Sequence, residues 1–350
     1  MYRIVQASLL TLLLARASLA GCLQTDSGNS DEQGDTFVIA FSVKDDYTNV
    51  DENPQRLADF LSLELNMSVS VYPVDSDGAA LQALRFGNAD IALMDAGSAW
   101  IGWQQYGLEA LAADQNSDGR TYYNAHAVVL NDSDIAAAYL DDDPSTDPYA
   151  VMEGATSCHT GWLKSAGMLI PMGFLIGSGY AEVVGDQDDI ESLRSTIVNF
   201  FSEEASIPDS GTPYYSYSGA VKCLSEGVGD VAFVKDSTLA TFCGNGTDSA
   251  PEAWCLPESR YIMLPSYGVA PSHPVMYNPA KSDAATMTQV QDALVAMQST
   301  EEGQDILEAV LNTPALSATN ATLHLGPYGE LIDGVPGITS YFNSKYEIVE

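Results

Sequence analysis

The chain has 350 residues, of which 46% are hydrophobic, so it is long enough for about two domains. It carries 48 acidic and 13 basic side chains, which gives a formal net charge of −35 at pH 7. This balance excludes binding to nucleic acid or to an anionic membrane surface through bulk electrostatics. A surface rich in acids and poor in lysine is instead typical of a protein that works at high salt, where screening weakens self-repulsion.

The N-terminus reads as an export signal over residues 1–21. Arg3 supplies positive charge, and residues 7–15 are mostly apolar but too few for a stable transmembrane anchor. The sequence Leu-Ala-Gly-Cys, which ends at Cys22, resembles a lipobox, in which cleavage before the cysteine leaves a lipid on it. We therefore expect a lipid on Cys22 and a flexible tether over residues 22–35, which hold almost no apolar side chains. A plain signal peptide cut nearby is the alternative.

The next segment alternates between strand and helix patterns. We expect strands over residues 36–43, 68–73 and 89–94, and helices over residues 53–65 and 79–86. This β-α-β-α-β order predicts an open α/β sheet whose ligands lie beyond the strand ends.

A second α/β unit follows, entered and left by two crossing segments. Residues 122–130 form an expected strand long enough to pass between domains, and residues 266–277 look like the return crossing. Residues 287–311 are strongly helical, and the tail is punctuated by Gly and Pro. Between the crossings we expect helices within residues 188–203 and 214–224 and a strand over residues 230–234. The pattern predicts two lobes with a cleft suited to ligand capture, lobe 1 over residues 36–125 plus 274–345 and lobe 2 over residues 126–273.

Residues 157–173 read SCHTGWLKSAGMLIPMG, a polar loop that enters an apolar helix and is expected to stop at Pro171. We take Thr160 as the N-cap of this helix. The free amides near Ala166 and Gly167, together with Lys164, would then face an anion. An ordinary capped helix with a surface lysine is the alternative.

Four further side chains stand where such a cleft would use them: Asp95, Tyr123 (or its neighbour Tyr122), Tyr217 and His273. One carboxylate, two phenolates and one imidazole supply three negative charges, which match a small trivalent cation such as Fe(III). Each residue also has an ordinary interpretation, as a helix cap, a packing tyrosine or a loop histidine. We find no nucleophile elbow, phosphate-cradling glycine loop, His-x-His or Cys-x-x-Cys motif, so we expect no enzyme.

The central motif SCHTGWLKSAGMLIPMG resembles the anion-binding stretch of the transferrins. YYSYSGAVKCLSEGVGDVAFVKDST is similar to the transferrin run with the second tyrosine ligand, LMDAG to the aspartate motif, and APSHPV to the histidine motif. The resemblance covers about residues 37–345, one transferrin lobe. The first strand and helix also resemble the binding proteins of phosphonate and phosphate importers, which share the type II periplasmic-binding-protein fold with transferrins.

The resemblance implies a role for each motif. The implied Fe(III) ligands are Asp95, Tyr123, Tyr217 and His273, and the implied carbonate site consists of Thr160, Lys164 and the amides of Ala166 and Gly167. From the sequence alone, the four cysteines that remain after Cys22 allow three disulfide pairings. The resemblance implies that Cys158 pairs with Cys223, which leaves Cys243 with Cys255.

Two departures from the transferrin pattern affect the anion and the release of the metal. Lys164 stands where transferrins usually carry arginine, and a lysine cannot clamp carbonate bidentately. Lys235 matches one lysine of the two-lysine pH trigger of some transferrin lobes, but residues 311–324 hold no lysine to act as its partner.

The register of the first tyrosine ligand has two solutions. Matching the paired tyrosines selects Tyr122, whereas matching Ala127 and the two valines after it selects Tyr123. We take Tyr123, because Ala125 and Ala127 then share its face of the strand.

We therefore expect a monomeric, lipid-anchored binding protein on the outer face of the cell membrane that captures Fe(III) with carbonate and delivers it to an ABC importer permease. The alternative is a phosphate or phosphonate binding protein of an ABC importer, which uses the Thr160 and Lys164 site without a metal. An enzyme in the cleft is a third, weaker hypothesis. Asp95 discriminates between the first two, because a buried carboxylate that faces an oxyanion is unfavourable unless it is protonated or accepts a hydrogen bond from the ligand.

Overall fold

The computed structural model describes residues 36–42, 52–143, 145–244 and 250–346. The expected signal peptide, the lipid on Cys22 and the tether lie outside the described residues and stay predictions. Within the described ranges, no helix is both long and apolar enough to cross a membrane.

The first sheet has six strands: β1 (Phe37–Ser42), β2 (Val69–Val74), β3 (Ile91–Leu93), β4 (Glu109–Asp114), β10 (Pro274–Tyr277) and β11 (Leu316–Ala318). Their order across the sheet is β11-β4-β10-β3-β1-β2. β1 pairs in parallel with β2 and β3, whereas β10 runs antiparallel to β3 and β4. The strand ends at β3 and β10 therefore meet at one edge of the molecule's first lobe, next to the expected ligands Asp95 and His273.

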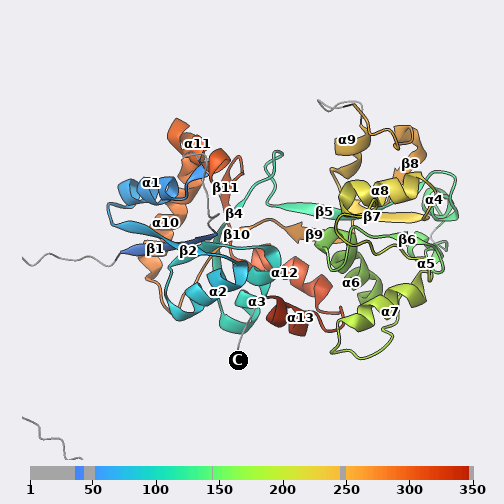
Figure 1. The fold of residues 1–350 in the computed structure, drawn as a ribbon, viewed down its shortest axis with the longest axis horizontal. Helices are drawn as coiled ribbons and strands as arrows, with labels where there is room; N and C mark the ends of the chain where they lie inside the picture. Colours follow the sequence, from blue (N-terminus) through green and yellow to red (C-terminus); the bar gives the residue numbers. More distant parts are fainter. Residues whose placement is uncertain (1–35, 43–51, 144, 245–249, 347–350) are drawn as a thin grey trace, which may run out of the picture. The chain divides into compact units, whose positions relative to one another are not determined.

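Helices cover both faces of this sheet (Figure 1). Ile39 packs with α1 (Gln55–Leu65), α10 (Ala284–Ala296) and α11 (Glu301–Ala309), whereas its neighbour Ala40 packs with α2 (Asp77–Phe86) and α3 (Ala96–Tyr106). Successive side chains of a strand point to opposite faces, so a strand buried on both sides is apolar throughout.

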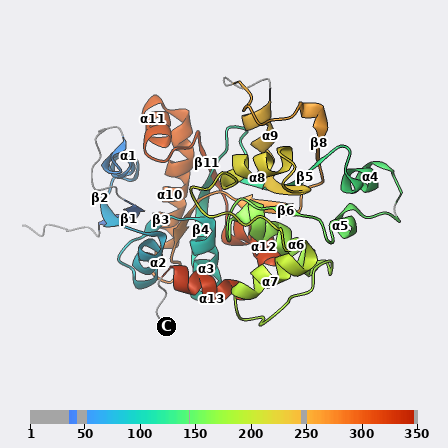
Figure 2. The same cartoon turned by 45° about the vertical axis from the view of Figure 1, so that its right-hand side comes forward.

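The second sheet follows the same rule. It contains β5 (Tyr122–Leu130), β6 (Ser157–Cys158), β7 (Val231–Lys235) and β8 (Tyr261–Met263) in the order β6-β7-β5-β8, and β9 (Gly268–Pro271) also pairs with β5. Phe233 packs on the face that carries α6 (Ile170–Gly177) and α7 (Glu191–Phe200). Val234 packs on the other face, with α8 (Ser216–Ser225) and α9 (Thr238–Cys243). In Figure 2, α8 and α9 lie on the opposite side of this sheet from α6 and α7. Two short helices, α4 (Asp134–Leu140) and α5 (Pro148–Val151), complete this lobe.

The chain changes sheet twice. It leaves the first sheet after β4 and enters the second at β5, and it returns between β9 and β10 through Ser272 and His273. The expected two-lobe α/β architecture with two crossings is confirmed. β5 belongs to the second sheet from Tyr122 onward, and the exact lobe boundaries stay a prediction.

The expected helix start at Thr160 and stop at Pro171 are both wrong. A short π-helix, η2 (Ser165–Leu169), begins after Lys164, which occupies the N-cap position without a side-chain bond. α6 continues directly from η2, and Pro171 lies in its first turn. Proline is tolerated there because the first amides of a helix have no partner within it.

The C-terminal third is more helical than expected. The helical pattern over residues 287–311 is interrupted by Thr300, whose hydroxyl accepts from the Gly303 amide (3.0 Å) and starts a new helix. The Gly- and Pro-rich tail forms α12 (Ala321–Ile332), capped by Asn320, and α13 (Ile338–Lys345). Both helices contact elements near the crossing segments, α12 against β9 and α6 and α13 against α3.

Both disulfides implied by the transferrin resemblance are confirmed. Cys158 is bonded to Cys223 across 65 residues of chain, and Cys243 is bonded to Cys255 across 12 residues. The first joins β6 to α8. β6 precedes the expected anion loop (residues 159–164), and α8 carries Tyr217, the second expected tyrosine.

Removing the longer-span disulfide should destabilise the protein more than removing the shorter one. In the chain-entropy model a cross-link restricts the unfolded chain more when it closes a longer loop, which here amounts to a difference of about 1.5 kcal/mol. We expect the Cys158→Ser/Cys223→Ser protein to have the lower free energy of unfolding in urea at high salt. The Cys243→Ser/Cys255→Ser protein is the matched control, and equal losses in the two proteins would contradict the expectation.

Candidate ligand-binding site

The loop after β6 brings unpaired donors to the start of η2. The first hydrogen bond of η2 runs from the Leu169 amide to the Lys164 carbonyl (3.0 Å), so the amides of Ala166 and Gly167 precede it. Thr160 is only 2% exposed, and in the described part of the chain its Oγ1 atom has no hydrogen-bond partner. A buried hydroxyl left unpaired costs about 1–3 kcal/mol, which a ligand can offset by supplying the missing bond.

A buried histidine holds this helix start from behind. His159 Nδ1 lies 2.9 Å from the carbonyl oxygen of Gly167, and its Nε2 lies 3.0 Å from Ser157 Oγ. Because a carbonyl only accepts, Nδ1 carries the proton and Nε2 accepts from the serine. Burial lowers the pKa of His159 to about 4, so the ring is neutral near pH 7.

Gly167 is required because the buried Thr160 hydroxyl packs directly against its backbone. A Cβ atom at this position would lie 1.8 Å from Thr160 Oγ1, far inside any real contact distance. On the other side of the loop, Gly161 has a φ of 135° and packs against the ring of Tyr215. Lys164 Nζ lies 5.7 Å from the centroid of the same ring, so the loop's charge stands beside this tyrosine.

The two expected tyrosine ligands contact each other. The side chains of Tyr123 of β5 and Tyr217 in the first turn of α8 lie close enough for each to influence the pKa of the other's phenol. Burial raises the pKa of both phenols, and the proximity of Tyr123 raises that of Tyr217 further. Lys235 Nζ lies 5.9 Å from the Tyr123 ring centroid and 5.5 Å from that of Tyr217. Both phenols are therefore protonated near neutral pH, and a ligand that binds a phenolate has to displace a proton.

Asp95 is both a helix cap and part of the cavity wall. Its Oδ1 accepts from the Ser98 amide (2.7 Å) at the start of α3. The Tyr346 hydroxyl lies 2.7 Å from Oδ1 and 2.9 Å from Oδ2, and Lys345 Nζ lies 3.4 Å from Oδ2. Burial alone would raise the pKa of Asp95, but Lys345 and the hydrogen bonds outweigh burial and lower the pKa. The carboxylate is therefore ionised and already carries several donors.

His273 is positioned by the end of β4. Its amide donates to Asp114 Oδ1 (2.6 Å), and its Nδ1 lies 3.1 Å from Asp114 Oδ2. This hydrogen bond to Asp114 raises the pKa of His273. Because the carboxylate accepts from Nδ1, the neutral ring keeps Nε2 for another partner, as is usual for histidines that bind metals.

The expected residues line two cavities that share Tyr123 and Ser165. The first cavity, of about 180 Å³, is lined by Asp95, Tyr123 and His273 together with residues of α12 and α13. The second, of about 320 Å³, is lined by Tyr123, Thr160, Lys164 and Tyr217 together with Tyr215 and Ser216. The structure thus brings the four expected metal ligands and the anion loop to neighbouring walls, with Ala166 and Gly167 buried behind them.

Tyr122 is placed differently from Tyr123. It is 38% exposed, its ring lies 5.5 Å from the guanidinium carbon of Arg120, and it lines neither cavity. The register that selects Tyr123 is the one that places a phenol in the site.

Sequence reasoning missed three residues of the first cavity: Tyr328, Lys345 and Tyr346. They lie on α12 and at the end of α13, in the tail that Gly and Pro made look irregular. Asn320, an N-cap before an apolar run, was the available signal for α12. In the described ranges, no three His, Cys, Asp or Glu side chains are grouped so that they can hold a metal ion, so a metal here needs the phenols.

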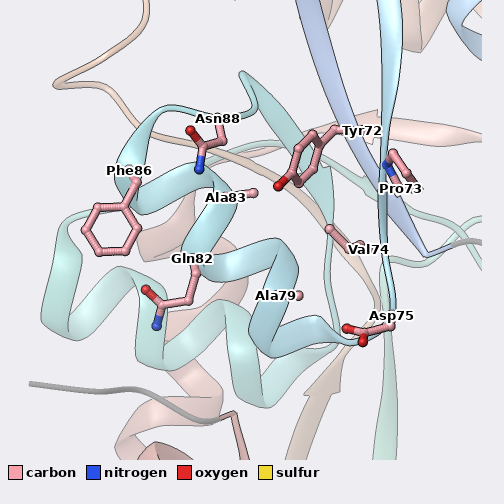
Figure 3. A pocket seen from close by; sticks show the side chains of 9 residues that line it. All are labelled: Tyr72, Pro73, Val74, Asp75, Ala79, Gln82, Ala83, Phe86 and Asn88. Atoms are coloured by element: carbon pink, nitrogen blue, oxygen red, sulfur yellow. The ribbon is translucent and has the colours of Figure 1, made fainter.

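A larger cavity of about 480 Å³ lies between β2, at the edge of the first sheet, and α2 (Figure 3). It is lined by Tyr72, Pro73, Val74, Asp75, Ala79, Gln82, Ala83, Phe86 and Asn88. It contains none of the expected site residues and shares none with the two cavities above.

Comparison with known proteins relates the chain to two groups. Residues 39–323 match the family model described as ABC transporter, phosphonate, periplasmic substrate-binding protein. Lactotransferrin of Desmodus rotundus is 34% identical over 187 residues, 45% of this chain and 24% of that protein. Serotransferrin of Bos taurus is 31% identical over 247 residues, 59% of this chain and 32% of that protein. The aligned part is thus about a quarter to a third of the length of these transferrins, and the expected resemblance to them is confirmed.

Solved structures agree with the fold. XAC2383 from Xanthomonas citri bound to chloride ion superposes with a TM-score of 0.54 at 17% identity, covering 87% of this chain and 99% of that one. The same protein bound to ATP gives a TM-score of 0.53 at 16% identity, covering 87% and 98%. Together with the family model, these similarities confirm the expected periplasmic-binding-protein fold.

The buried ring of His159 should make the protein lose stability in mild acid. Its pKa is about 4 in the folded state against 6.5 for a free histidine, so below pH 6.5 the unfolded chain binds the proton that the folded chain refuses. The free energy of unfolding should therefore fall by up to about 3 kcal/mol as the pH drops from 6.5 to 4. A His159→Gln protein has no such titration and should lose correspondingly less in urea unfolding at the two pH values. An equal loss in both proteins would show that His159 does not contribute.

Proposed function

Because the chain belongs to the family of periplasmic substrate-binding proteins of phosphonate ABC transporters, we propose that it captures an oxyanion such as phosphate or a phosphonate. It works outside the cytoplasm and presents this ligand to the permease of an importer. The observation that carries the proposal is the buried, unpartnered hydroxyl of Thr160 beside the first amides of η2 and Lys164. Hydroxyl and ammonium donors on one wall, with the first amides of η2 behind them, suit the several acceptor oxygens of an oxyanion.

The charges around the cavities support an anionic ligand. Lys164 and Lys345 line one cavity each, in a chain with only 13 Lys and Arg residues against 48 acids. Asp95 would repel an oxyanion if it were bare, but it accepts from Tyr346 and lies beside Lys345. Donors from the protein itself therefore offset the repulsion between the buried Asp95 carboxylate and an oxyanion ligand.

A second candidate ligand is Fe(III) bound together with carbonate. The observation that favours it is the adjacent pair of Tyr123 and Tyr217, which line the same cavity as Thr160 and Lys164. Two phenolates, His273 Nε2 and the Asp95 carboxylate are hard or intermediate donors that suit a trivalent cation. In this case the anion loop would hold carbonate, and Asp95 would have to leave Lys345 and Tyr346.

Removing the unpartnered hydroxyl of Thr160 should weaken anion binding. We expect Thr160→Val to lower the affinity for phosphate or methylphosphonate about 10- to 100-fold, because one hydrogen bond to a charged ligand is lost. Isothermal titration calorimetry at high salt measures the effect. Thr238→Val is the matched control, because Thr238 Oγ1 is also buried and unpartnered among the described residues but lines neither cavity. Equal affinities in wild type and Thr160→Val would contradict the proposed site.

The iron candidate makes a separate optical prediction. Ferric iron supplied as a weak chelate with bicarbonate should give a visible tyrosinate-to-iron band that Tyr217→Phe loses and Tyr122→Phe keeps. Because burial raises the pKa of both ligand phenols, acid should release the metal: protons compete for the ligands as the pH falls. No band in the wild-type protein at neutral pH, or a band that Tyr217→Phe retains, would eliminate this candidate.

A further inference from the structure

The end of α13 occupies the Asp95 side of the first cavity. Tyr346 is 4% exposed, and its hydroxyl contacts both carboxylate oxygens of Asp95. Lys345 Nζ lies 2.9 Å from the same hydroxyl and 3.4 Å from Asp95 Oδ2. We call Lys345 and Tyr346 the Asp95 clasp.

The surroundings are shaped to receive the clasp. A Cβ atom on Gly97 would lie 2.5 Å from the Tyr346 hydroxyl, and one on Gly78 would lie 2.4 Å from the Tyr346 carbonyl oxygen. Phe342, one turn earlier on α13, packs its ring 5.7 Å from that of Trp100 on α3 and 5.8 Å from that of Tyr346. Close packing against two glycines on two helices, together with the aromatic contacts of Phe342, therefore holds Tyr346 against Asp95.

The clasp decides which charge the cavity presents. Asp95 and Asp77 lie close together, since Asp77 Oδ1 accepts from the Asp95 amide (3.2 Å). Without a cation, two neighbouring carboxylates would make this wall attractive to a metal and hostile to an anion. Lys345 supplies that cation, and its side chain, 42% exposed, also lines the cavity.

We propose that Lys345 and Tyr346 are specificity-determining residues: they occupy Asp95 and prevent the first cavity from binding a trivalent cation, which leaves the oxyanion of the neighbouring second cavity as the preferred ligand. This inference rests on the proposed function for the identity of the anion. That the clasp keeps a cation away from Asp95 is inferred from the geometry of the clasp alone. Removing the clasp should turn Asp95 from a neutralised wall residue into a ligand for a cation.

The test uses Tb(III), a trivalent cation whose luminescence is sensitised by nearby tyrosines, at high monovalent salt. We expect Lys345→Ala/Tyr346→Phe to bind Tb(III) at least about tenfold more tightly than wild type, because a neighbouring positive charge is gone. Adding Asp95→Asn should abolish this gain in Tb(III) affinity. Lys345→Arg keeps the positive charge and should bind Tb(III) no more tightly than wild type. Lys222→Ala controls for the change of one unit in net charge, because Lys222 lines neither cavity.

The single change Lys345→Ala is tested as well, in case the double variant does not fold. It removes only a partly exposed side chain and leaves the Tyr346 ring in place. No gain in Tb(III) affinity in either variant, or a gain that survives Asp95→Asn, would overturn the proposal. Methylphosphonate titration of the same proteins tests the proposed oxyanion function separately from the role of the clasp. We expect the clasp variants to bind the anion about tenfold more weakly than wild type, by loss of one cation. If the wild type binds no oxyanion, the proposed function fails, while the Tb(III) result still decides the clasp.

Discussion

The hydrogen bond from His159 to the carbonyl of Gly167 is the contact on which the candidate site depends. It fixes the start of η2 from the buried side, next to the second cavity, which Thr160, Lys164 and Ser165 line. A charged imidazole would be unfavourable there, and burial keeps the ring neutral. The same segment is tied to α8 by the disulfide of Cys158, so the anion loop is covalently linked to the helix that carries Tyr217. Such a link suits a site that binds a small anion through several fixed donors.

The two candidate ligands use the same anion loop and differ in what they require of the other residues. An oxyanion alone leaves both phenols protonated and Asp95 held by Lys345 and Tyr346. Ferric iron requires the phenols to ionise against a raised pKa and requires Asp95 to exchange its protein donors for the metal. Asp95 is already held by Lys345 and Tyr346. The oxyanion is the leading proposal because residues 39–323 match the phosphonate-binding family model.

The sequence predicted the parts of this site that depend on local pattern. The strand over residues 122–130 was placed correctly because its two tyrosines and two valines favour strands, and Asp95 and His273 were found because they follow or separate strands. The sequence could not predict the π-helix, since the start of η2 is fixed by His159 and the packing of Gly167, which are tertiary contacts. The predicted helix stop at Pro171 was wrong because a proline breaks a helix in its interior but is tolerated in its first turn.

The clasp was missed for a related reason. α13 follows a Gly- and Pro-rich segment, and nothing in its own sequence shows that Lys345 lies beside a residue 250 positions earlier. The helix is stabilised by the edge-to-face contact of Phe342 with Trp100, a contact between two distant segments. Local propensity carries no information about such a pairing.

The most direct measurement is a crystal structure of the protein grown with methylphosphonate, with the ligand located in the density. The account predicts phosphonate oxygens within hydrogen-bond distance of Thr160 Oγ1, Lys164 Nζ and the amides of Ala166 and Gly167, with Lys345 still on Asp95. A phosphonate found only elsewhere, for example in the cavity between β2 and α2, with Thr160 Oγ1 still unpartnered, would contradict it.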